Sequence, residues 1–122
     1  MPASGPLAGI TVIDLSRILA GPYCTLLMAE LGARVIKVEP PGKGDDAREY
    51  GPFVKGKSTY FSSVNRGKES IALDLKAAAG QRIFEALLAK ADVVVENFRP
   101  GTMEKLGYGW ESLHRRYPRL IY

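Results

Sequence analysis

Two apolar strand patterns flank a helical pattern near the start of the chain, and this arrangement constrains the fold more than any other feature. Residues 9–14 and 34–39 are short, almost continuous apolar runs, as expected of strands covered on both faces of a parallel sheet. Apolar residues recur at helical spacing from Pro22, which suits a first helical turn, to Gly32, which suits a helix end. The pattern predicts a βαβ unit with a right-handed crossover.

The remainder of the chain continues this alternation. Residues 40–58 are rich in glycine, proline and charge, which predicts a long loop, and Thr59–Phe61 favours a short strand or turn. Further strands are predicted at Ser70–Leu73, Asp92–Glu96 and from Arg119 onward, and helices at 77–90, just after Gly101 and at 110–116. The fold class expected is α/β, a Rossmann-like, mostly parallel sheet flanked by helices. Because the chain stops as a strand begins, we expect that sheet to be incomplete at its C-terminus.

Composition and charge narrow the class of protein. Seventeen Lys and Arg against thirteen Asp and Glu give the 122 residues a net charge of +4. The basic residues are spread along the chain and do not alternate with aromatic residues, so we expect no nucleic-acid partner. The apolar runs are too short to span a bilayer and the N-terminus lacks a signal-peptide pattern. The single cysteine, Cys24, fits a reducing compartment, and we expect a cytoplasmic protein without a membrane partner.

A phosphate-loop spacing occurs between Gly51 and Ser58, G-x-x-x-x-G-K-S. In that motif Lys57 would reach a phosphate and Ser58 would hold magnesium. The motif needs a buried strand before it and a helix after it. Here a charged segment precedes it, Thr59–Phe61 favours a strand, and Pro52 removes one N–H from the cradle. A nucleotide-binding module is therefore a disfavoured hypothesis.

A relaxed dinucleotide fingerprint at Gly42–Ala47 is also disfavoured. It follows the second predicted strand, and Asp45 and Asp46 would face a pyrophosphate with like charge. Glu39 stands where such folds carry a ribose-binding acid, but a solvated charge at a strand end explains it equally well. We therefore expect no nicotinamide or flavin.

Three other reactive residues have simpler explanations. Cys24 is expected to pack as a small apolar residue within a helix, and His114 to lie on an exposed helix face beside two arginines. Asp14 ends the first predicted strand, where it could act in catalysis but more often caps the following turn. One histidine and one cysteine cannot build a catalytic triad or a metal cluster, so we expect no metal.

The segment Asn97–Gly101 is more informative, because it follows a predicted parallel strand and precedes a helix. Ligands of open α/β sheets bind beyond these carboxyl ends. Asn97 offers a donor and acceptors and Phe98 a flat surface, while Arg99 and Lys105 could meet phosphate. A turn with a packed phenylalanine remains an equal alternative on the residues alone.

Several blocks of sequence resemble family III CoA-transferases, a family that includes formyl-CoA transferase, and together they cover essentially the whole chain. The blocks are Pro6–Ser16, Ala20–Thr25, Leu31–Gly42, Asn65–Lys76 and Ala91–Gly101. The segment Gly42–Arg48 with Gly51–Phe53 most resembles members that use succinyl-CoA and dicarboxylic acids.

This resemblance implies a reaction. Members transfer CoA between an acyl-CoA and a free carboxylic acid through an aspartate nucleophile, which forms a mixed anhydride that CoA thiolate then attacks. The substrates are acyl-CoA and a carboxylic acid, no metal or nicotinamide is needed, and members form intertwined homodimers. The nucleophile lies downstream of the matched segment, and Asp14, Asp74 and Asp92 do not match it. Residues 1–122 would then be the N-terminal Rossmann-like CoA-binding region of a longer enzyme, with no catalytic residue of their own, and inactive alone.

The resemblance also implies CoA contacts. The matching positions are Ile18, Leu73, Lys76, Asn97, Phe98 and Lys105. Two positions depart from other members: Pro40 replaces an arginine that helps to bind the nucleotide end, and Leu19 replaces the glutamine that formyl-CoA transferase has near the thioester. An α-methylacyl-CoA racemase has a similar N-terminal region and is the alternative, although the run Ser16–Pro22 favours a transferase.

Overall fold

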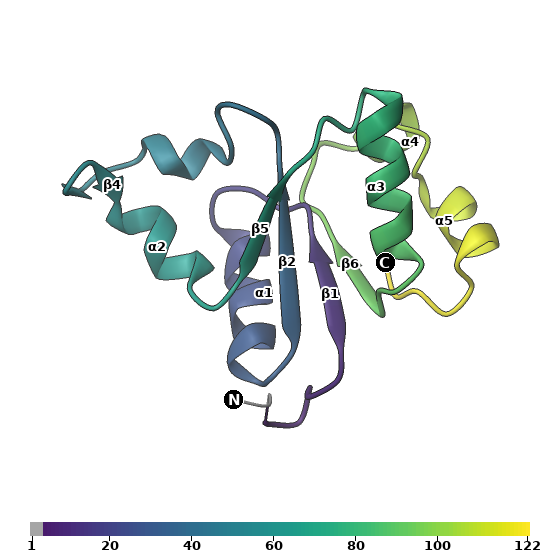
Figure 1. Ribbon diagram of the computed structural model, residues 1–122, viewed down its shortest axis with the longest axis horizontal. Coiled ribbons are helices and arrows are strands. Elements are labelled where there is room, and N and C mark those ends of the chain that lie inside the picture. Colours follow the sequence, from purple (N-terminus) through teal and green to yellow (C-terminus); the bar gives the residue numbers. More distant parts are fainter. Residues whose placement is uncertain (1–3) are drawn as a thin grey trace.

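The computed structural model describes residues 4–122 and is built around a central parallel sheet (Figure 1). In chain order its elements are β1 (Thr11–Asp14), α1 (Ala20–Glu30), β2 (Arg34–Glu39), the 3-10 helix η1 (Asp46–Glu49), β3 (Phe53–Val54), β4 (Lys57–Ser58), α2 (Thr59–Asn65), β5 (Glu69–Ala72), α3 (Ala78–Leu88), β6 (Val93–Val95), α4 (Thr102–Lys105) and α5 (Trp110–Arg116). The α/β class predicted from the apolar patterns is confirmed.

The four main strands lie in the order β5-β2-β1-β6, and every neighbouring pair is parallel. Ile13 in the middle strand β1 is paired with Ile36 on one side and Val94 on the other. The chain therefore builds the sheet outward from β1 in one direction and then returns to add β6 on the opposite side. Such a reversal of strand order makes a crevice at the carboxyl ends of the two strands that flank it.

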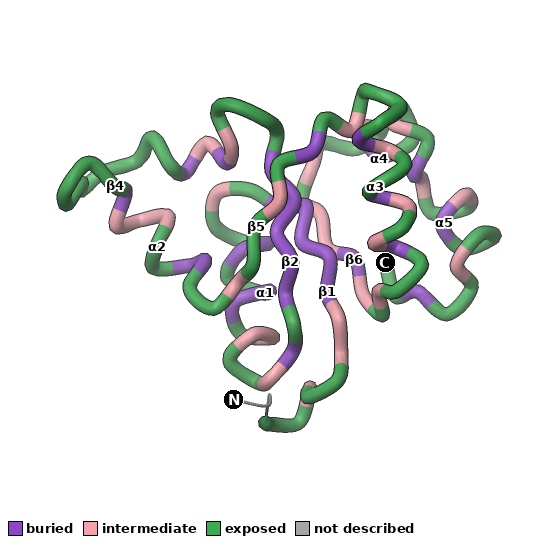
Figure 2. Tube along the Cα trace, viewed as in Figure 1, coloured by how far each residue is buried: buried purple, intermediate pink, exposed green. Residues whose placement is uncertain are grey.

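Helices cover both faces of this sheet, and alternate residues of each strand point to opposite faces. On one face Val12 and Val35 pack with Met28 and Ala29 of α1. On the other face a larger core forms around Ile13, Ile36 and Val94, with Phe84 and Leu88 of α3, Met103 of α4 and Leu113 of α5. Figure 2 shows the buried residues concentrated in the middle strands β1 and β2, whereas β5 at the sheet edge is largely exposed. A sheet buried on both faces accounts for its almost continuous apolar strands.

The prediction of a strand or turn at Thr59–Phe61 is wrong, because α2 begins at Thr59. Ser58 is its N-cap, and the Ser58 hydroxyl accepts a hydrogen bond from the Phe61 N–H at 3.0 Å. A serine in that role stabilises a helix start and outweighs the strand preference of the aromatic residues that follow. The long loop 40–58 also contains η1 and the short antiparallel hairpin β3–β4.

Other predicted elements agree with the structure to within a few residues. The last predicted strand is present as a single parallel bridge between Val93 and Ile121. Helix α1 begins at Ala20, so Pro22 lies within its first turn. No helix within residues 4–122 has the length and apolar character needed to cross a membrane.

Candidate functional site

A cavity of about 270 Å³ opens at the carboxyl ends of β1, β2 and β5. Of the sequence-predicted site residues, Leu73, Lys76 and Phe98 line it, although they come from two distant segments. Its walls are formed by Leu15, Ser16, Arg17, Lys37, Val38, Glu39, Pro40, Pro41, Asp45, Leu73, Asp74, Leu75, Lys76, Phe98 and Leu106. A mostly apolar cavity with a few polar groups at this edge of an open α/β sheet is the usual place for a ligand.

Asn97 lies beside this cavity and uses its amide to hold the loop that follows β1. The Arg17 N–H donates to Asn97 Oδ1 at 2.8 Å, and Asn97 Nδ2 donates to the Arg17 carbonyl at 2.9 Å. The amide retains a second N–H and a second lone pair that these bonds do not use. Asn97 therefore joins the loops after β1 and β6 and still presents polar groups to a ligand.

The rim of the cavity carries cations, together with the exposed carboxylate of Asp74. The Arg17 guanidinium lies 5.2 Å from the centre of the Phe98 ring, a cation–π contact across the two loops. Lys76 is exposed at the opposite wall, and Lys105 is exposed next to Leu106, which lines the cavity. Within residues 4–122 no ion pair involves Arg17, Lys76 or Lys105. Unpaired cations around an apolar cavity favour a ligand with both a ring and phosphate groups.

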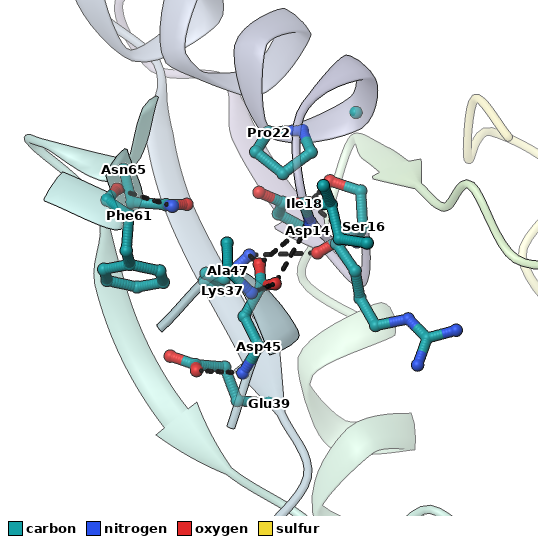
Figure 3. A network of polar contacts seen from close by, with 12 residues as sticks. Asp14, Ser16, Ile18, Pro22, Lys37, Glu39, Asp45, Ala47, Phe61 and Asn65 are labelled. Carbon is teal, nitrogen blue, oxygen red and sulfur yellow. Dashed lines mark hydrogen bonds and ion pairs between the residues drawn. The ribbon is translucent and has the colours of Figure 1, made fainter. Parts of the chain in front are cut away.

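Beneath the rim lies a buried ion pair between Lys37 and Asp45 (Figure 3). Lys37 Nζ and Asp45 Oδ2 are 2.8 Å apart, and both side chains are at most 2% exposed. Lys37 Nζ also donates to the Ser16 carbonyl at 2.9 Å, and the Ile18 N–H donates to Asp45 Oδ1 at 3.1 Å. Asp45 is therefore neutralised within the protein, so the expectation that it would repel a phosphate with a free negative charge is wrong.

Glu39 is neither a free ribose-binding acid nor a solvated strand-end charge. Burial alone would raise the pKa of Glu39, but hydrogen bonds from Arg48, from the Asp45 N–H and from Ser70 lower it to about 2. Arg48 binds both carboxylate oxygens at 2.7 Å. The guanidinium is itself 3.9 Å from the centre of the Phe61 ring. Glu39 thus anchors the loop after β2 to the sheet.

Asp14 is fully buried and acts as the turn cap that the alternative interpretation favoured. It accepts hydrogen bonds from the Ser16 N–H at 2.9 Å, from the Ser16 hydroxyl and from Thr25 Oγ1 at 2.6 Å. Lys68 Nζ lies 3.0 Å from Asp14 Oδ2, the same oxygen that Thr25 binds. Burial lowers the pKa of Lys68 although the Asp14 carboxylate opposes that change. A carboxylate with both oxygens occupied and no exposed surface is not placed to attack a substrate.

The phosphate-loop spacing at Gly51–Ser58 forms the hairpin β3–β4 and not a phosphate cradle. Residues before it form η1 and not a buried strand. The Ser58 hydroxyl donates to the Ala47 carbonyl at 3.0 Å while capping α2, so it is committed to the fold. The helix that follows does meet one requirement of the motif, contrary to expectation, but the missing strand excludes the phosphate-loop geometry.

The two remaining reactive side chains are both exposed. This confirms the prediction for His114, whose ring stacks on Trp110 at 4.7 Å between centres. The prediction for Cys24 is wrong, because it lies on the outer side of α1. No group of three or more His, Cys, Asp and Glu residues suited to a metal ion occurs among residues 4–122.

Sequence reasoning did not identify Arg17, Lys37 and Asp45 as parts of the site. Lys37 alternates with apolar residues in a buried strand, and a lysine at such a position signals a buried partner. That partner comes from a loop eight residues further on, which the strand and helix patterns alone do not place. Arg17 follows the first strand directly, at the edge where ligands bind.

The parallel strand order and the cavity at the carboxyl ends of β1, β2 and β5 define a Rossmann-like α/β protein. The particular family is shown by sequence: the chain belongs to CoA-transferase family III, whose family model matches residues 7–122. The resemblance noted from the sequence blocks is therefore confirmed.

Characterised relatives are similar to this chain over almost all of its length. It is 56% identical to the acetyl-CoA:oxalate CoA-transferase of Acetobacter aceti and 51% identical to the succinyl-CoA:glutarate CoA-transferase of Mus musculus, with 97% and 96% of the chain covered. The matched region is 30% and 27% of those proteins, so the chain spans about a third of the length of these relatives.

Solved structures support the same assignment. A CAIB/BAIF family protein from Brucella suis superposes with a TM-score of 0.90 at 46% identity, covering 97% of this chain and 32% of that protein. A short chain dehydrogenase/reductase family protein, 16% identical with a TM-score of 0.52, shares the fold alone. The N-terminal third of a family III CoA-transferase therefore has this fold.

Proposed function

We propose that residues 1–122 form the CoA-binding N-terminal region of a CoA-transferase that moves CoA between an acyl-CoA and a free carboxylic acid. The observation that carries this proposal is the cavity at the carboxyl edge of the sheet. Leu73 and Lys76, which follow β5, and Phe98, which follows β6, meet in its walls. The family resemblance implied CoA contacts at the same three positions.

The chemistry of CoA suits this cavity and its rim. An adenine or pantetheine group would bind against the apolar walls and the Phe98 ring, and the unpaired cations Lys76 and Lys105 would neutralise phosphates. Asn97 would offer its remaining amide donor and acceptor, and Ile18 would contribute from the loop after β1. Pro40, also in the wall, carries no charge, so the phosphates are expected to rely on the lysines.

The covalent step is assigned to an aspartate outside these residues. That carboxylate would attack the thioester carbonyl and release CoA thiolate, leaving a mixed anhydride; the thiolate would then attack the aspartyl carbonyl and release the donor acid. The acceptor acid would enter by the reverse steps. The burial and full hydrogen bonding of Asp14 support this assignment, because Asp14 also ends a strand at the cavity edge. The role of the described residues is to bind and orient CoA.

The relatives support a proposal for the substrate class, and the surface supports a proposal for an assembly. The relatives act on acetyl-CoA or succinyl-CoA and on dicarboxylic acids such as oxalate and glutarate, and we propose that class for this protein. We also propose a homodimer that acts in the cytoplasm. Leu19, Tyr23 and Leu27 support an assembly, because they follow one side of α1 at four-residue spacing and are 43% to 53% exposed.

Calorimetric titration of the purified chain with CoA and with ATP tests the proposal. We expect CoA to bind with a clear preference over ATP, and Lys57→Ala to leave CoA binding unchanged, because Lys57 lies in the hairpin away from the cavity walls. Equal binding of both nucleotides, or loss of binding in Lys57→Ala, would contradict the proposal. The chain alone should show no CoA transfer; turnover at an enzymatic rate would place the nucleophile within it.

A further inference from the structure

Ile18 adopts an unusual backbone conformation at the edge of the cavity. Its φ is 72°, in the left-handed region, which β-branched residues rarely occupy. Within residues 4–122 only one other non-glycine residue has a positive φ, Lys55 in the turn of the β3–β4 hairpin. A side chain with a branched Cβ is disfavoured in this conformation, so the surrounding structure must hold Ile18 there.

Side chains from three other segments bind the backbone of this loop. Lys37 of β2 donates to the Ser16 carbonyl, and Asn97 after β6 binds both polar groups of the Arg17 backbone. The Ile18 N–H donates to both oxygens of Asp45, at 3.1 Å and 3.3 Å. Figure 3 shows Lys37 and Asp45 converging on Ser16 and Ile18. Of these contacts, the one from Asp45 reaches the strained residue itself.

Asp45 is well suited to hold another residue because several contacts fix its own position. Its carboxylate pairs with Lys37 and accepts the Ala47 N–H at 2.9 Å, and its N–H donates to Glu39 Oε2 at 2.8 Å. Its side chain is 1% exposed. The acceptor offered to Ile18 is therefore held in place by three other contacts in a buried environment, where hydrogen bonds are stronger than in water.

The conformation of Ile18 controls the cavity rim through its neighbour. Arg17 lies between Ser16 and Ile18, both bound by the Lys37–Asp45 pair, and its guanidinium stands over Phe98 at the cavity edge. A return of Ile18 to a negative φ would change the angle between the Ser16–Ile18 loop and α1, and the Arg17 backbone would then depend on its bonds to Asn97.

We propose that Asp45 is a positioning residue for CoA binding, which holds Ile18 in the left-handed conformation and so keeps the Ser16–Ile18 loop and the Arg17 side chain in place at the cavity rim. This inference rests on the proposed function, that the cavity binds CoA. In this scheme Asp45 acts through Ile18: it belongs to the cavity wall, but its side chain is only 1% exposed and its carboxylate is bound by Lys37, Ile18 and Ala47.

The test is a double-mutant cycle on CoA affinity with Asp45→Asn and Ile18→Gly. Glycine adopts a positive φ without strain, so residue 18 then depends less on its hydrogen bond to Asp45. We expect Asp45→Asn to weaken CoA binding about tenfold in the Ile18 background and less than about threefold in the Ile18→Gly background. In the unliganded protein, the strong intraresidue Hα–HN NOE that marks a positive φ at Ile18 should weaken in Asp45→Asn.

Asp46→Asn is the matched control, because it neutralises the adjacent aspartate, whose exposed carboxylate pairs with Lys43 at 3.2 Å and with no other cation among residues 4–122. It should change neither CoA affinity nor the NOE. If the Asp45→Asn variant does not fold, a double variant with Lys37→Met and Asp45→Asn replaces it in the cycle. Removing both buried charges avoids leaving one of them unpaired.

The outcomes separate the two proposals. Equal loss of affinity in both backgrounds, or an unchanged NOE in Asp45→Asn, overturns the positioning role. Absence of CoA binding by the unmodified chain overturns the proposed function and the CoA part of this inference, while the NOE still decides whether Asp45 holds Ile18.

Discussion

Asn97 and Arg17 are joined by a pair of hydrogen bonds that links the loop after β6 to the loop after β1. The Arg17 N–H donates to Asn97 Oδ1 at 2.8 Å, and Asn97 Nδ2 donates to the Arg17 carbonyl at 2.9 Å. The Asn97 amide thus satisfies both the N–H and the carbonyl of Arg17 and connects the loop after β6 to the loop after β1. This contact makes Asn97 part of the scaffold of the site as well as a candidate ligand contact.

Asn97→Ala should weaken CoA binding by about tenfold or more, because both bonds to the Arg17 backbone and any contact with the ligand are lost together. Asn97→Asp separates these contributions. It keeps the acceptor for the Arg17 N–H, loses the donor to the Arg17 carbonyl, and adds a negative charge near the phosphates. Calorimetric titration should therefore show a larger loss for Asn97→Asp at low salt than at high salt; a loss independent of salt would contradict a phosphate nearby.

Lys76→Ala and Lys105→Ala should each weaken CoA binding by about tenfold while leaving the unfolding midpoint unchanged, because both side chains are exposed and unpaired within residues 4–122. The lysine that binds the 3′-phosphate should lose its effect when dephospho-CoA replaces CoA in the titration. Lys90→Ala, an exposed lysine at the end of α3, is the matched control and should leave both affinities unchanged.

Much of the fold was predictable because it follows from local patterns. The apolar runs of β1 and β2 and the helical spacing between them specify a βαβ unit whose handedness is fixed by strand twist. The position of the segment Asn97–Gly101 was also predictable, because its place after an apolar strand puts it at the carboxyl edge of the sheet. The approach of Phe98 to Leu73 and Lys76 then follows from strand order and family resemblance.

The charged scaffold beneath the site was not predictable from local patterns. The pairings of Asp45 with Lys37 and of Glu39 with Arg48 depend on how the loop after β2 folds back over the sheet. Helix α2 was missed because a single hydroxyl, that of Ser58, decides its start. The exposure of Cys24 was missed because α1 is apolar on its outer side too, so periodicity does not separate its two faces.

Ser58→Ala tests whether the Gly51–Ser58 spacing is structural. The hydroxyl caps α2 and donates to the Ala47 carbonyl, so its loss should lower the free energy of unfolding by about 1–2 kcal/mol. CoA affinity should not change. Urea unfolding followed by circular dichroism measures the first quantity and calorimetry the second. Ser63→Ala, which removes an exposed hydroxyl of the same helix, is the control.

Gly21→Ala tests the close approach of α1 to the loop after β1. A Cβ at Gly21 would lie 2.2 Å from Ser16 Cβ and 2.5 Å from Ser16 Oγ, so Ser16 or the helix must move. We expect a loss of about 1–3 kcal/mol in the free energy of unfolding, together with weaker CoA binding. Cys24→Ala on the exposed side of the same helix should stay within about 0.5 kcal/mol of the parent chain. A Gly21→Ala protein as stable as the parent would contradict this packing.

Glu39 should make the stability of the protein depend on pH in the acid range. Its pKa is lowered from an ordinary 4.5 to about 2, so the folded state holds this group ionised where the unfolded state takes up a proton. The stabilisation is therefore fully present above 4.5 and is lost as the pH falls from 4.5 toward 2. Solvent screens the pair because Arg48 is 43% exposed. We accordingly expect a contribution of about 2 kcal/mol.

Comparison of the parent chain with Glu39→Gln isolates this contribution from the other carboxylates. The difference in free energy of unfolding between the two proteins should be constant near neutral pH and shrink as the pH falls through this range. Glu69→Gln, which removes an exposed carboxylate paired with Arg34 at 2.7 Å, should show a much smaller pH dependence because both side chains of this pair are solvated. A Glu39→Gln difference that does not vary with pH would show that Arg48 does not hold Glu39 ionised, and the loop after β2 would then need another anchor.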